Sequence, residues 1–168
     1  NFKAGAVSGS FNSKTGKFLS YHINNVSLIT SFPEPYFWRA PTDNDFGNQM
    51  PQRLGFWRTA HSLLQLDTVI VQEQNKEGLI IACYYRMTGV DISYIISYQL
   101  LNNGAVKVTA AIDLQNKKLP EMPRFGMRLT LPKSYEQIDF YGRGPWENYS
   151  DRNTAAFVGL YKQKQADQ

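Results

Sequence analysis

Two short polar segments hold most of the side chains that could bind or transform a small molecule. The first polar segment runs from Tyr36 to Trp57 and begins YFWRAPTDNDFG, which places Arg39, Asp43, Asn44 and Asp45 within seven residues of one another. Carboxylate and amide groups bind hydroxyls, and aromatic faces pack against sugar rings. This combination is typical of a carbohydrate pocket.

The second polar segment, YGRGPWENYSDRNT from Tyr141 to Thr154, has a similar composition. Its polar side chains are those of Glu147, Asn148, Asp151 and Arg152, which follow Trp146. Segments rich in glycine, proline and paired charges usually lie at one end of a β-sandwich, where sites are built.

A structural interpretation stands beside the sugar-binding one. Arg39 could pair with Asp151 or Glu147, and Arg152 with Asp43 or Asp45, because buried charges are tolerated only when they are paired. Such reciprocal ion pairs would lock the two polar segments together at one rim of the molecule. The two interpretations are compatible, since a locked loop can also line a cleft.

The acidic residues do not form a convincing catalytic pair. Asp43 and Asp45 are two residues apart, and in an extended loop they would point to opposite sides. Glycoside hydrolysis needs two carboxyl groups on either side of the scissile bond, and a general acid needs a raised pKa, whereas neighbouring arginines lower the pKa of a carboxyl group. The two histidines, His22 and His61, lie far apart in the sequence, and we expect His22 to lie within a strand.

Composition and charge exclude several functional classes. The 168 residues carry a formal net charge of +4, but the basic side chains are scattered, so we expect no nucleic-acid binding. No apolar run is long enough to cross a membrane. The single cysteine, Cys83, excludes an internal disulfide and is expected to be a buried, inert thiol. The chain starts without a methionine, so we expect it to be part of a longer protein, and its residues indicate no cellular compartment.

Alternation of apolar and polar residues predicts the elements that carry these segments. Period-two patterns are typical of strands, and they occur in AVSGSF, KFLSYHI, GLIIACYYRM, DISYIISYQL, AVKVTAAIDL, RFGMRLTLP and QIDFYGRGPW. NSKTGK, NKEG and the Asn103-Gly104 dipeptide predict tight hairpins, the last with φ > 0 at both of its residues. Helical periodicity is weak and confined to Leu54–Leu66. We therefore predict about ten strands in an all-β, mostly antiparallel sandwich that forms a single domain over residues 1–168.

The two polar segments closely resemble a known family. FWRAPTDNDFG and GRGPWENYSDRNTA are similar to the two characteristic stretches of the C-terminal small-chain domain of β-galactosidases in glycoside hydrolase family 2. GSFNSKTGKFLSYHINNVSLI, followed by FPEPYFWRAP, resembles the opening of that domain. The resemblance extends from about Val7 to Tyr161 in the family's order and spacing.

The resemblance implies a fold and a function. The fold would be a β-supersandwich like that of galactose mutarotase, with the chain forming the N-terminal part of the small-chain domain. The function would be that of an accessory domain of a retaining β-galactosidase, which hydrolyses terminal β-D-galactosides with two glutamates on a catalytic barrel absent from this chain. No catalytic residue, metal site or cofactor is carried over, and a divalent cation is allowed only in the full-length enzyme.

The resemblance also names residues that would shape the rim of the active site. They are Trp38, Arg39, Asp43, Asn44, Asp45, Gly47, Trp146, Glu147, Asn148, Asp151 and Arg152. Gly47, directly after the acidic cluster, would act as a hinge for a loop from Phe46 to Gly55. The expected partners are a β-galactoside or other carbohydrate and the missing barrel, and unpaired sheet edges would favour a homo-oligomer. The alternatives are a stand-alone carbohydrate-binding module and, less favoured because it needs an acid–base pair at the sugar, a mutarotase-like epimerase.

Overall fold

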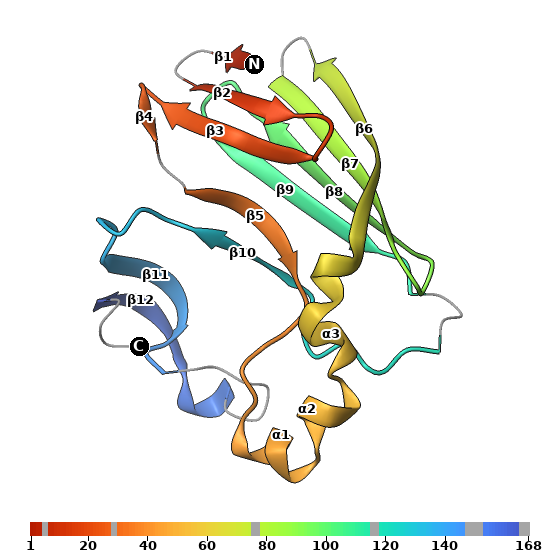
Figure 1. The fold of residues 1–168 in the computed structure, drawn as a ribbon. Helices are drawn as coiled ribbons and strands as arrows, with labels where there is room; N and C mark the ends of the chain where they lie inside the picture. The colour runs from red at the N-terminus through yellow and green to blue at the C-terminus, as the bar shows by residue number, and fades with distance from the viewer. Residues whose placement is uncertain (5–6, 28–29, 75–77, 115–117, 147–152, 165–168) are drawn as a thin grey trace. The chain divides into compact units, whose positions relative to one another are not determined.

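The computed structural model describes the chain in two compact units. They comprise Asn1–Thr130 and Leu131–Gln168, and each is described by itself. The structure describes residues 1–4, 7–27, 30–74, 78–114, 118–146 and 153–164 (Figure 1). Within these residues the strands are antiparallel, so the predicted all-β, mostly antiparallel class is confirmed.

Three groups of strands make up the first unit. One sheet has the order β1-β2-β3-β4, a second has the order β6-β7-β8-β9, and β5 pairs with β10. The bounds are β1 Phe2–Ala4, β2 Val7–Asn12, β3 Lys17–Ile23, β4 Val26–Ser27, β5 Ser31–Tyr36, β6 Leu64–Gln74, β7 Gly78–Met87, β8 Ile92–Leu100, β9 Val106–Ile112 and β10 Gly126–Thr130.

The two four-stranded sheets face each other and bury one apolar core (Figure 1). On β8, burial alternates residue by residue, with Ile92, Tyr94, Ile96, Tyr98 and Leu100 all buried. This is the face that the sequence pattern predicts, because side chains of a strand alternate between the two faces of a sheet.

Aromatic rings connect the opposed sheets across this core. The ring of Phe18 on β3 meets that of Tyr98 on β8 edge-on, with 5.0 Å between ring centroids. The Tyr21 hydroxyl donates a hydrogen bond to the Gly104 carbonyl at 2.7 Å, between β8 and β9. The sandwich is therefore held by aromatic packing and by a direct link from one sheet to the turn of the other.

The predicted hairpins are present, with one correction. Strands β2 and β3, β6 and β7, and β8 and β9 pair as antiparallel neighbours, as the turn signals between them predict. At the β8–β9 turn, Gly104 has φ +91, but Asn103 does not have a positive φ. The prediction of φ > 0 at both turn residues is therefore wrong. The Asn103 side chain instead accepts a hydrogen bond from the Ala105 amide at 3.0 Å, which stabilises the turn in another way.

The first polar segment contains regular structure that its composition did not suggest. It forms α1 Asp43–Gly47, α2 Met50–Arg53 and the start of α3 Phe56–Thr59, which leads into the short 3₁₀ helix η1 Ala60–Leu63. The predicted helix over Leu54–Leu66 is correct in part, because β6 begins at Leu64. The helices lie one after another below the sandwich of the first unit (Figure 1).

The second unit is built on one hairpin. Strand β11, Gln137–Gly144, pairs with β12, Phe157–Lys164, and a 3₁₀ turn, η2 Asn153–Ala155, precedes β12. The rings of Phe140 and Tyr161 lie 5.4 Å apart across this pair. The described residues form twelve strands, against about ten expected, and the strands that no quoted pattern covers are β1, β4, β5, β6 and β12.

One buried hydroxyl in the core leads to a stability prediction. Tyr94 is fully buried, and its hydroxyl has no hydrogen-bond partner among the residues that the structure describes. Burial raises the pKa of Tyr94 to about 12. An unpaired buried hydroxyl is unfavourable, so Tyr94→Phe should raise the free energy of unfolding by about 1 kcal/mol, measured by urea denaturation.

Tyr98→Phe is the matched control, because the Tyr98 hydroxyl donates to the Pro33 carbonyl at 3.1 Å. That variant should lose about 1 kcal/mol. Equal losses in both variants would show that the Tyr94 hydroxyl is bonded after all.

Candidate functional site

A capping box organises the start of the first polar segment. Thr42 is the N-cap of α1, and its hydroxyl accepts a hydrogen bond from the Asp45 amide at 3.4 Å. In return, the Asp45 carboxylate accepts from the Thr42 amide at 2.8 Å and from the Thr42 hydroxyl at 3.0 Å. These reciprocal bonds satisfy amide groups that a helix start leaves unpaired. They fix where the helix begins.

Arg39 completes this arrangement. Its guanidinium binds the Asp45 carboxylate through two nitrogens, with Nη2 at 2.8 Å from Oδ1 and Nη1 bonded to Oδ2. Planar arginine–carboxylate pairs of this type are both strong and directional. The Arg39 guanidinium and the Thr42 amide hold the pKa of Asp45 far below its usual range. Asp45 is therefore ionised at neutral pH, where it holds the start of α1 in place and is unsuited to act as a general acid.

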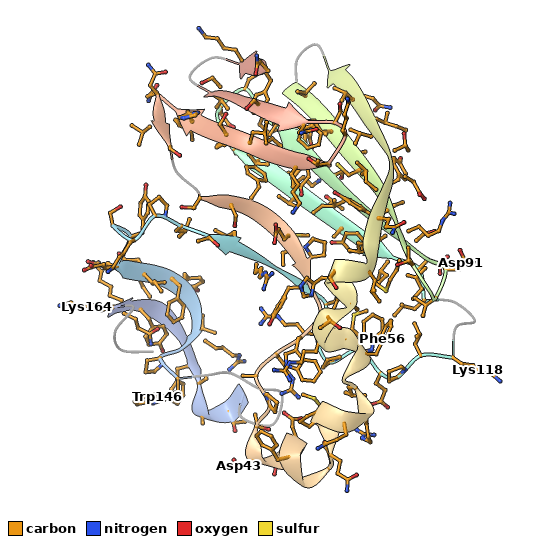
Figure 2. The ribbon with its side chains drawn as sticks, viewed as in Figure 1. Asp43, Phe56, Asp91, Lys118, Trp146 and Lys164 are labelled. Atoms are coloured by element: carbon orange, nitrogen blue, oxygen red, sulfur yellow. The ribbon has the colours of Figure 1, made fainter. Side chains whose placement is uncertain are left out.

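The other predicted residues of this segment have different environments. Trp38 is buried, whereas Asp43, Asn44 and Gly47 are exposed, and Asp43 lies at the start of α1 (Figure 2). The expectation that the two aspartates occupy an extended loop is wrong, because both lie in the first turn of a helix. They do differ in surroundings, since Asp45 is buried and Asp43 faces solvent. Asp43 and Asn44 are therefore free to meet a ligand or another protein surface.

An aromatic cluster at the two ends of the segment anchors it to the core. Trp57 is completely buried, and its indole nitrogen donates to the Pro120 carbonyl at 2.9 Å. The rings of Phe37 and Phe56 pack edge-on against it, at 5.8 and 5.0 Å. Buried aromatic residues thus come before and after the Arg39–Asp45 pair in the sequence and tie both ends of the segment to the apolar core.

The second polar segment is described only in part. Trp146 is 78% exposed and follows Pro145, whose carbonyl accepts a hydrogen bond from Gln163 at 2.7 Å. The predicted residues Glu147, Asn148, Asp151 and Arg152 lie outside the described residues. Ion pairing between the two polar segments therefore stays a prediction. Within the described residues, the carboxylate bound by Arg39 comes from its own segment.

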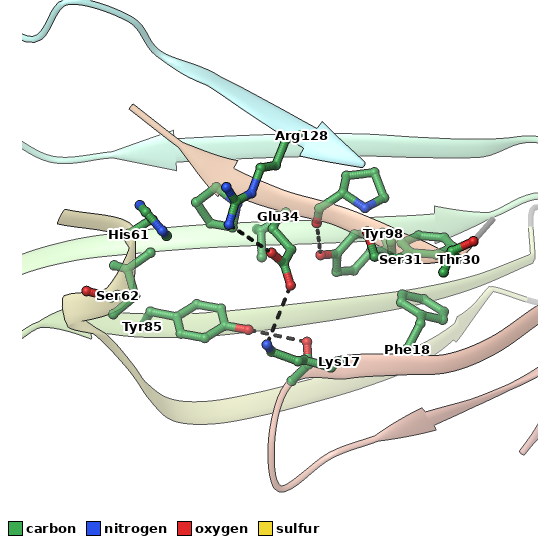
Figure 3. A pocket seen from close by; sticks show the side chains of 16 residues that line it. Lys17, Phe18, Thr30, Ser31, Glu34, His61, Ser62, Tyr85, Tyr98 and Arg128 are labelled. Atoms are coloured by element: carbon green, nitrogen blue, oxygen red, sulfur yellow. Dashed lines mark hydrogen bonds and ion pairs between the residues drawn. The ribbon is translucent and has the colours of Figure 1, made fainter. Parts of the chain in front are cut away.

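A pocket in the first unit was missed by the sequence interpretation. Its volume is about 520 Å³, and it is lined by residues of β3, β5, β7, β8, β10 and η1 (Figure 3). Its charged side chains are those of Lys17, Glu34 and Arg128, and the imidazole of His61 also lines it. One sequence signal did exist, because Glu34 stands between two prolines in FPEPYFW, where a regular alternation breaks.

Comparison with known proteins assigns the chain to a family. The model of the β-galactosidase small chain matches residues 3–168. The chain belongs to the β-galactosidase small-chain family. The resemblance on which the two polar segments were interpreted is thereby confirmed.

Several curated relatives of this small-chain member carry β-galactosidase names. The β-galactosidase of Priestia megaterium is 36% identical over 152 residues, which cover 90% of the chain and 14% of that protein. The β-galactosidase of Halalkalibacterium halodurans is 30% identical over 159 residues, covering 94% of the chain and 16% of the protein. The β-galactosidase small subunit of Latilactobacillus sakei is 27% identical over 172 residues, covering 90% and 54%. The chain thus spans about a seventh of the long relatives and about half of the short one.

The described part of this small-chain member shows neither a metal cluster nor a membrane helix. No group of three or more histidine, cysteine, aspartate or glutamate side chains is placed to hold a metal ion in the residues that the structure covers. In those same ranges, no helix has the length and hydropathy needed to cross a membrane. Cys83 is buried as expected, and burial raises the pKa of its thiol to about 11.

Proposed function

We propose that this chain is the accessory part of a retaining β-galactosidase of glycoside hydrolase family 2. The complete enzyme hydrolyses terminal β-D-galactosides, and its catalytic glutamates lie on a larger catalytic part. The family assignment supports this proposal, as does a relative whose printed name is a β-galactosidase small subunit. Asp45 supports it too, because the one buried charged side chain among the described residues is committed to a structural ion pair.

In this proposal the first polar segment shapes the rim of the active site. The Arg39–Asp45 pair holds α1 in place, and α1 then presents Asp43, Asn44 and the 62% exposed ring of Phe46 outward. An exposed ring beside a carboxylate and an amide suits a sugar or the surface of a catalytic domain. The second polar segment stays a predicted part of the rim, on the strength of the family resemblance alone. The observation that carries the proposal is that a buried ion pair, Arg39–Asp45, fixes a short helix whose neighbouring side chains are exposed.

A reconstitution assay tests the accessory role. The purified chain should give no hydrolysis of a chromogenic β-galactoside, because no acid–base pair is provided by its described residues. The catalytic part, produced without this segment, should be weakly active or inactive, and adding the chain should restore turnover and yield a complex in size-exclusion chromatography. Turnover by the chain alone would refute the proposal, as would a catalytic part that neither binds the chain nor responds to it.

A stand-alone carbohydrate-binding module is the second candidate, and the pocket of the first unit favours it. Titration of the isolated chain with galactose, lactose and longer β-galactosides, taken together with the reconstitution assay, separates the two functions. A module would bind sugar without the catalytic part and would not change turnover when added to it.

Gly47 provides a sharper test of the rim. Gly47 lies at the end of α1 without a positive φ, and a Cβ added to it would meet no atom within 4 Å. Alanine should therefore fit, and because alanine favours helix over glycine, Gly47→Ala should raise the free energy of unfolding by up to about 1 kcal/mol. If Gly47 is a hinge, the same change in the complete enzyme should alter both kcat and KM, since a stiffened helix end resists a second conformation.

Asn48→Ala, one residue further, is the control for a general disturbance of this helix end. Unchanged kcat and KM in the Gly47→Ala enzyme would exclude the hinge. An equal kinetic change in both variants would also argue against it.

A further inference from the structure

The pocket of the first unit has the dimensions of a small-molecule site. Its volume of about 520 Å³ lies within the range of roughly 300–1,000 Å³ that is usual for such sites. Its apolar wall is formed by Phe18, Phe32 and Ile96, which come from both sheets and from β5. The space is therefore wide enough for a ring-sized ligand and has a surface against which the ligand can pack.

Three charged side chains stand at the pocket in a fixed order. Glu34 on β5 lies directly opposite Arg128 on β10 in the strand register, so the pairing of these strands sets their position. The Glu34 carboxylate is 3.5 Å from Lys17 Nζ and 3.8 Å from Arg128 Nη2, and Figure 3 shows it between the two cations. The pocket therefore presents a hydrogen-bond donor at Lys17, an acceptor at Glu34 and a second donor at Arg128.

These ion pairs are loose enough to be shared with a ligand. The side chains of Lys17, Glu34 and Arg128 are 68%, 39% and 53% exposed. Exposed pairs at such distances add little to stability. Pro33 and Pro35 restrict the backbone on both sides of Glu34, so the Cα position of Glu34 at the pocket is well defined. Its carboxylate nevertheless remains partly exposed to solvent.

Further hydrogen-bonding groups of the pocket lining come from His61, Tyr85 and Tyr98. His61 Nδ1 is buried and has no hydrogen-bond partner among the described residues. Burial and the nearby Arg128 lower the pKa of His61, while Glu34 opposes this, so the imidazole is neutral at pH 7. The Tyr85 hydroxyl donates to the Gly16 carbonyl, and the Tyr98 hydroxyl donates to the Pro33 carbonyl, which leaves the Tyr98 oxygen able to accept.

From this arrangement we propose that the pocket binds a neutral, polyhydroxylated ring, such as a pyranose. Vicinal hydroxyls both donate and accept, so they match alternating donors and acceptors, and the C–H face of the ring can pack on the aromatic wall. A phosphate or carboxylate ligand fits less well, because Glu34 stands between the two cations and repels it. The site lies apart from Arg39 and Asp45, and the inference does not depend on the proposed accessory function.

Chemical-shift mapping on the complete 168-residue chain tests the proposal. Methyl β-D-galactopyranoside and methyl β-D-glucopyranoside are titrated into ¹⁵N-labelled protein, and sodium sulfate is titrated as the anionic probe. At least one glycoside should shift the amides of Ser31, Glu34, His61 and Arg128 with a dissociation constant in the millimolar range. Sulfate should shift them little.

Variants then identify the side chain that recognises the sugar. Glu34→Gln should weaken binding about tenfold, because it removes a charge-assisted acceptor. Glu121→Gln makes the same substitution at an exposed loop position and should leave affinity unchanged. Should Glu34→Gln fail to fold, Arg128→Gln replaces it. The amide chemical-shift map of the unmodified chain tests the location of binding without any variant.

Three outcomes would overturn the proposal. They are no saturable shifts with either glycoside, binding of sulfate in preference to both, and shifts that centre on Asp43 or Trp146 instead of the pocket. The last outcome would place the sugar on the rim and so leave the accessory function intact. Conversely, pocket binding would survive a failed reconstitution with the catalytic part, so the two proposals fail separately.

Discussion

Replacing Trp57 by alanine should lower the free energy of unfolding by about 3–5 kcal/mol, because this change empties a large buried site. Trp57 is fully buried, contacts the rings of Phe37 and Phe56, and donates a hydrogen bond to the Pro120 carbonyl. The variant would lose both the packing and the tie between α3 and the loop that precedes β10. Thermal denaturation should show a fall in Tm of about 10 °C.

Two controls make this result interpretable. Trp146→Ala makes the same substitution at a side chain that is 78% exposed, and it should leave the Tm nearly unchanged. Trp57→Phe keeps a ring in the core but cannot donate to Pro120, so its loss should be clearly smaller. Equal losses of stability in Trp57→Ala and Trp146→Ala would show that the aromatic cluster around Trp57 does not support the fold.

Asp45→Asn should lower the Tm at pH 7 by several degrees and should make the free energy of unfolding less dependent on pH. The asparagine side chain is neutral and cannot accept both of the guanidinium hydrogen bonds that the Asp45 carboxylate accepts from Arg39. The folded protein holds the pKa of Asp45 far below its usual range, mainly through Arg39 and the Thr42 amide. A lowered pKa in the folded state stabilises the protein above the unfolded pKa of about 4 and loses that contribution as the pH falls below it.

Urea unfolding of both proteins from pH 7 down to pH 3 measures this effect. The difference in stability should be largest at neutral pH and should narrow below about pH 4, as the carboxyl group begins to take up a proton in the unfolded chain. Asp43→Asn, two residues away and exposed, should remain close to the unmodified protein throughout. A constant difference across the whole range would mean that Asp45 acts through packing and not through its charge.

The sandwich of the first unit could be predicted because its signal is local. On β8, each of the buried residues Ile92, Tyr94, Ile96, Tyr98 and Leu100 follows the last after one partly or fully exposed residue, so the pattern itself fixes the inner face. On β9, partly buried residues alternate with exposed ones, and on β7 the buried residues Ile81, Cys83 and Met87 share one face. Turn residues between these strands then leave little freedom except to pair neighbours in sequence.

Elements without such a period were missed for separate physical reasons. In β5, two prolines interrupt the pattern of SFPEPY, and the strand exists because it pairs with β10. In β6, a register shift between Leu66 and Thr68 breaks the alternation just where the strand leaves η1. The helix α1 had a readable signal, since Thr42 followed by Asp45 is a capping pattern, but the proline and glycine around it favoured an irregular loop.

The candidate sites show the same division between local and distant information. The Arg39–Asp45 pair joins residues six apart, and its carboxylate and guanidinium were both expected to be paired, although with partners in the second polar segment. The pocket depends on Glu34 meeting Arg128, which is 94 residues further along the chain. Their proximity follows from the β5–β10 register, and single-sequence patterns carry no information about that pairing.

Because Cys83 is buried, its reaction with a thiol reagent can report how often the sandwich of the first unit opens. The thiol lies at the centre of β7 with no exposed surface, its pKa is raised to about 11 by burial, and the sequence has no other cysteine. An alkylating reagent can therefore modify the protein only when the two sheets separate, since the thiolate that reacts is otherwise both inaccessible and scarce. When the sheets close again faster than the reagent reacts, the rate of labelling is proportional to the equilibrium fraction of open molecules. Labelling rates would therefore measure the destabilisation caused by each core substitution above without any denaturant.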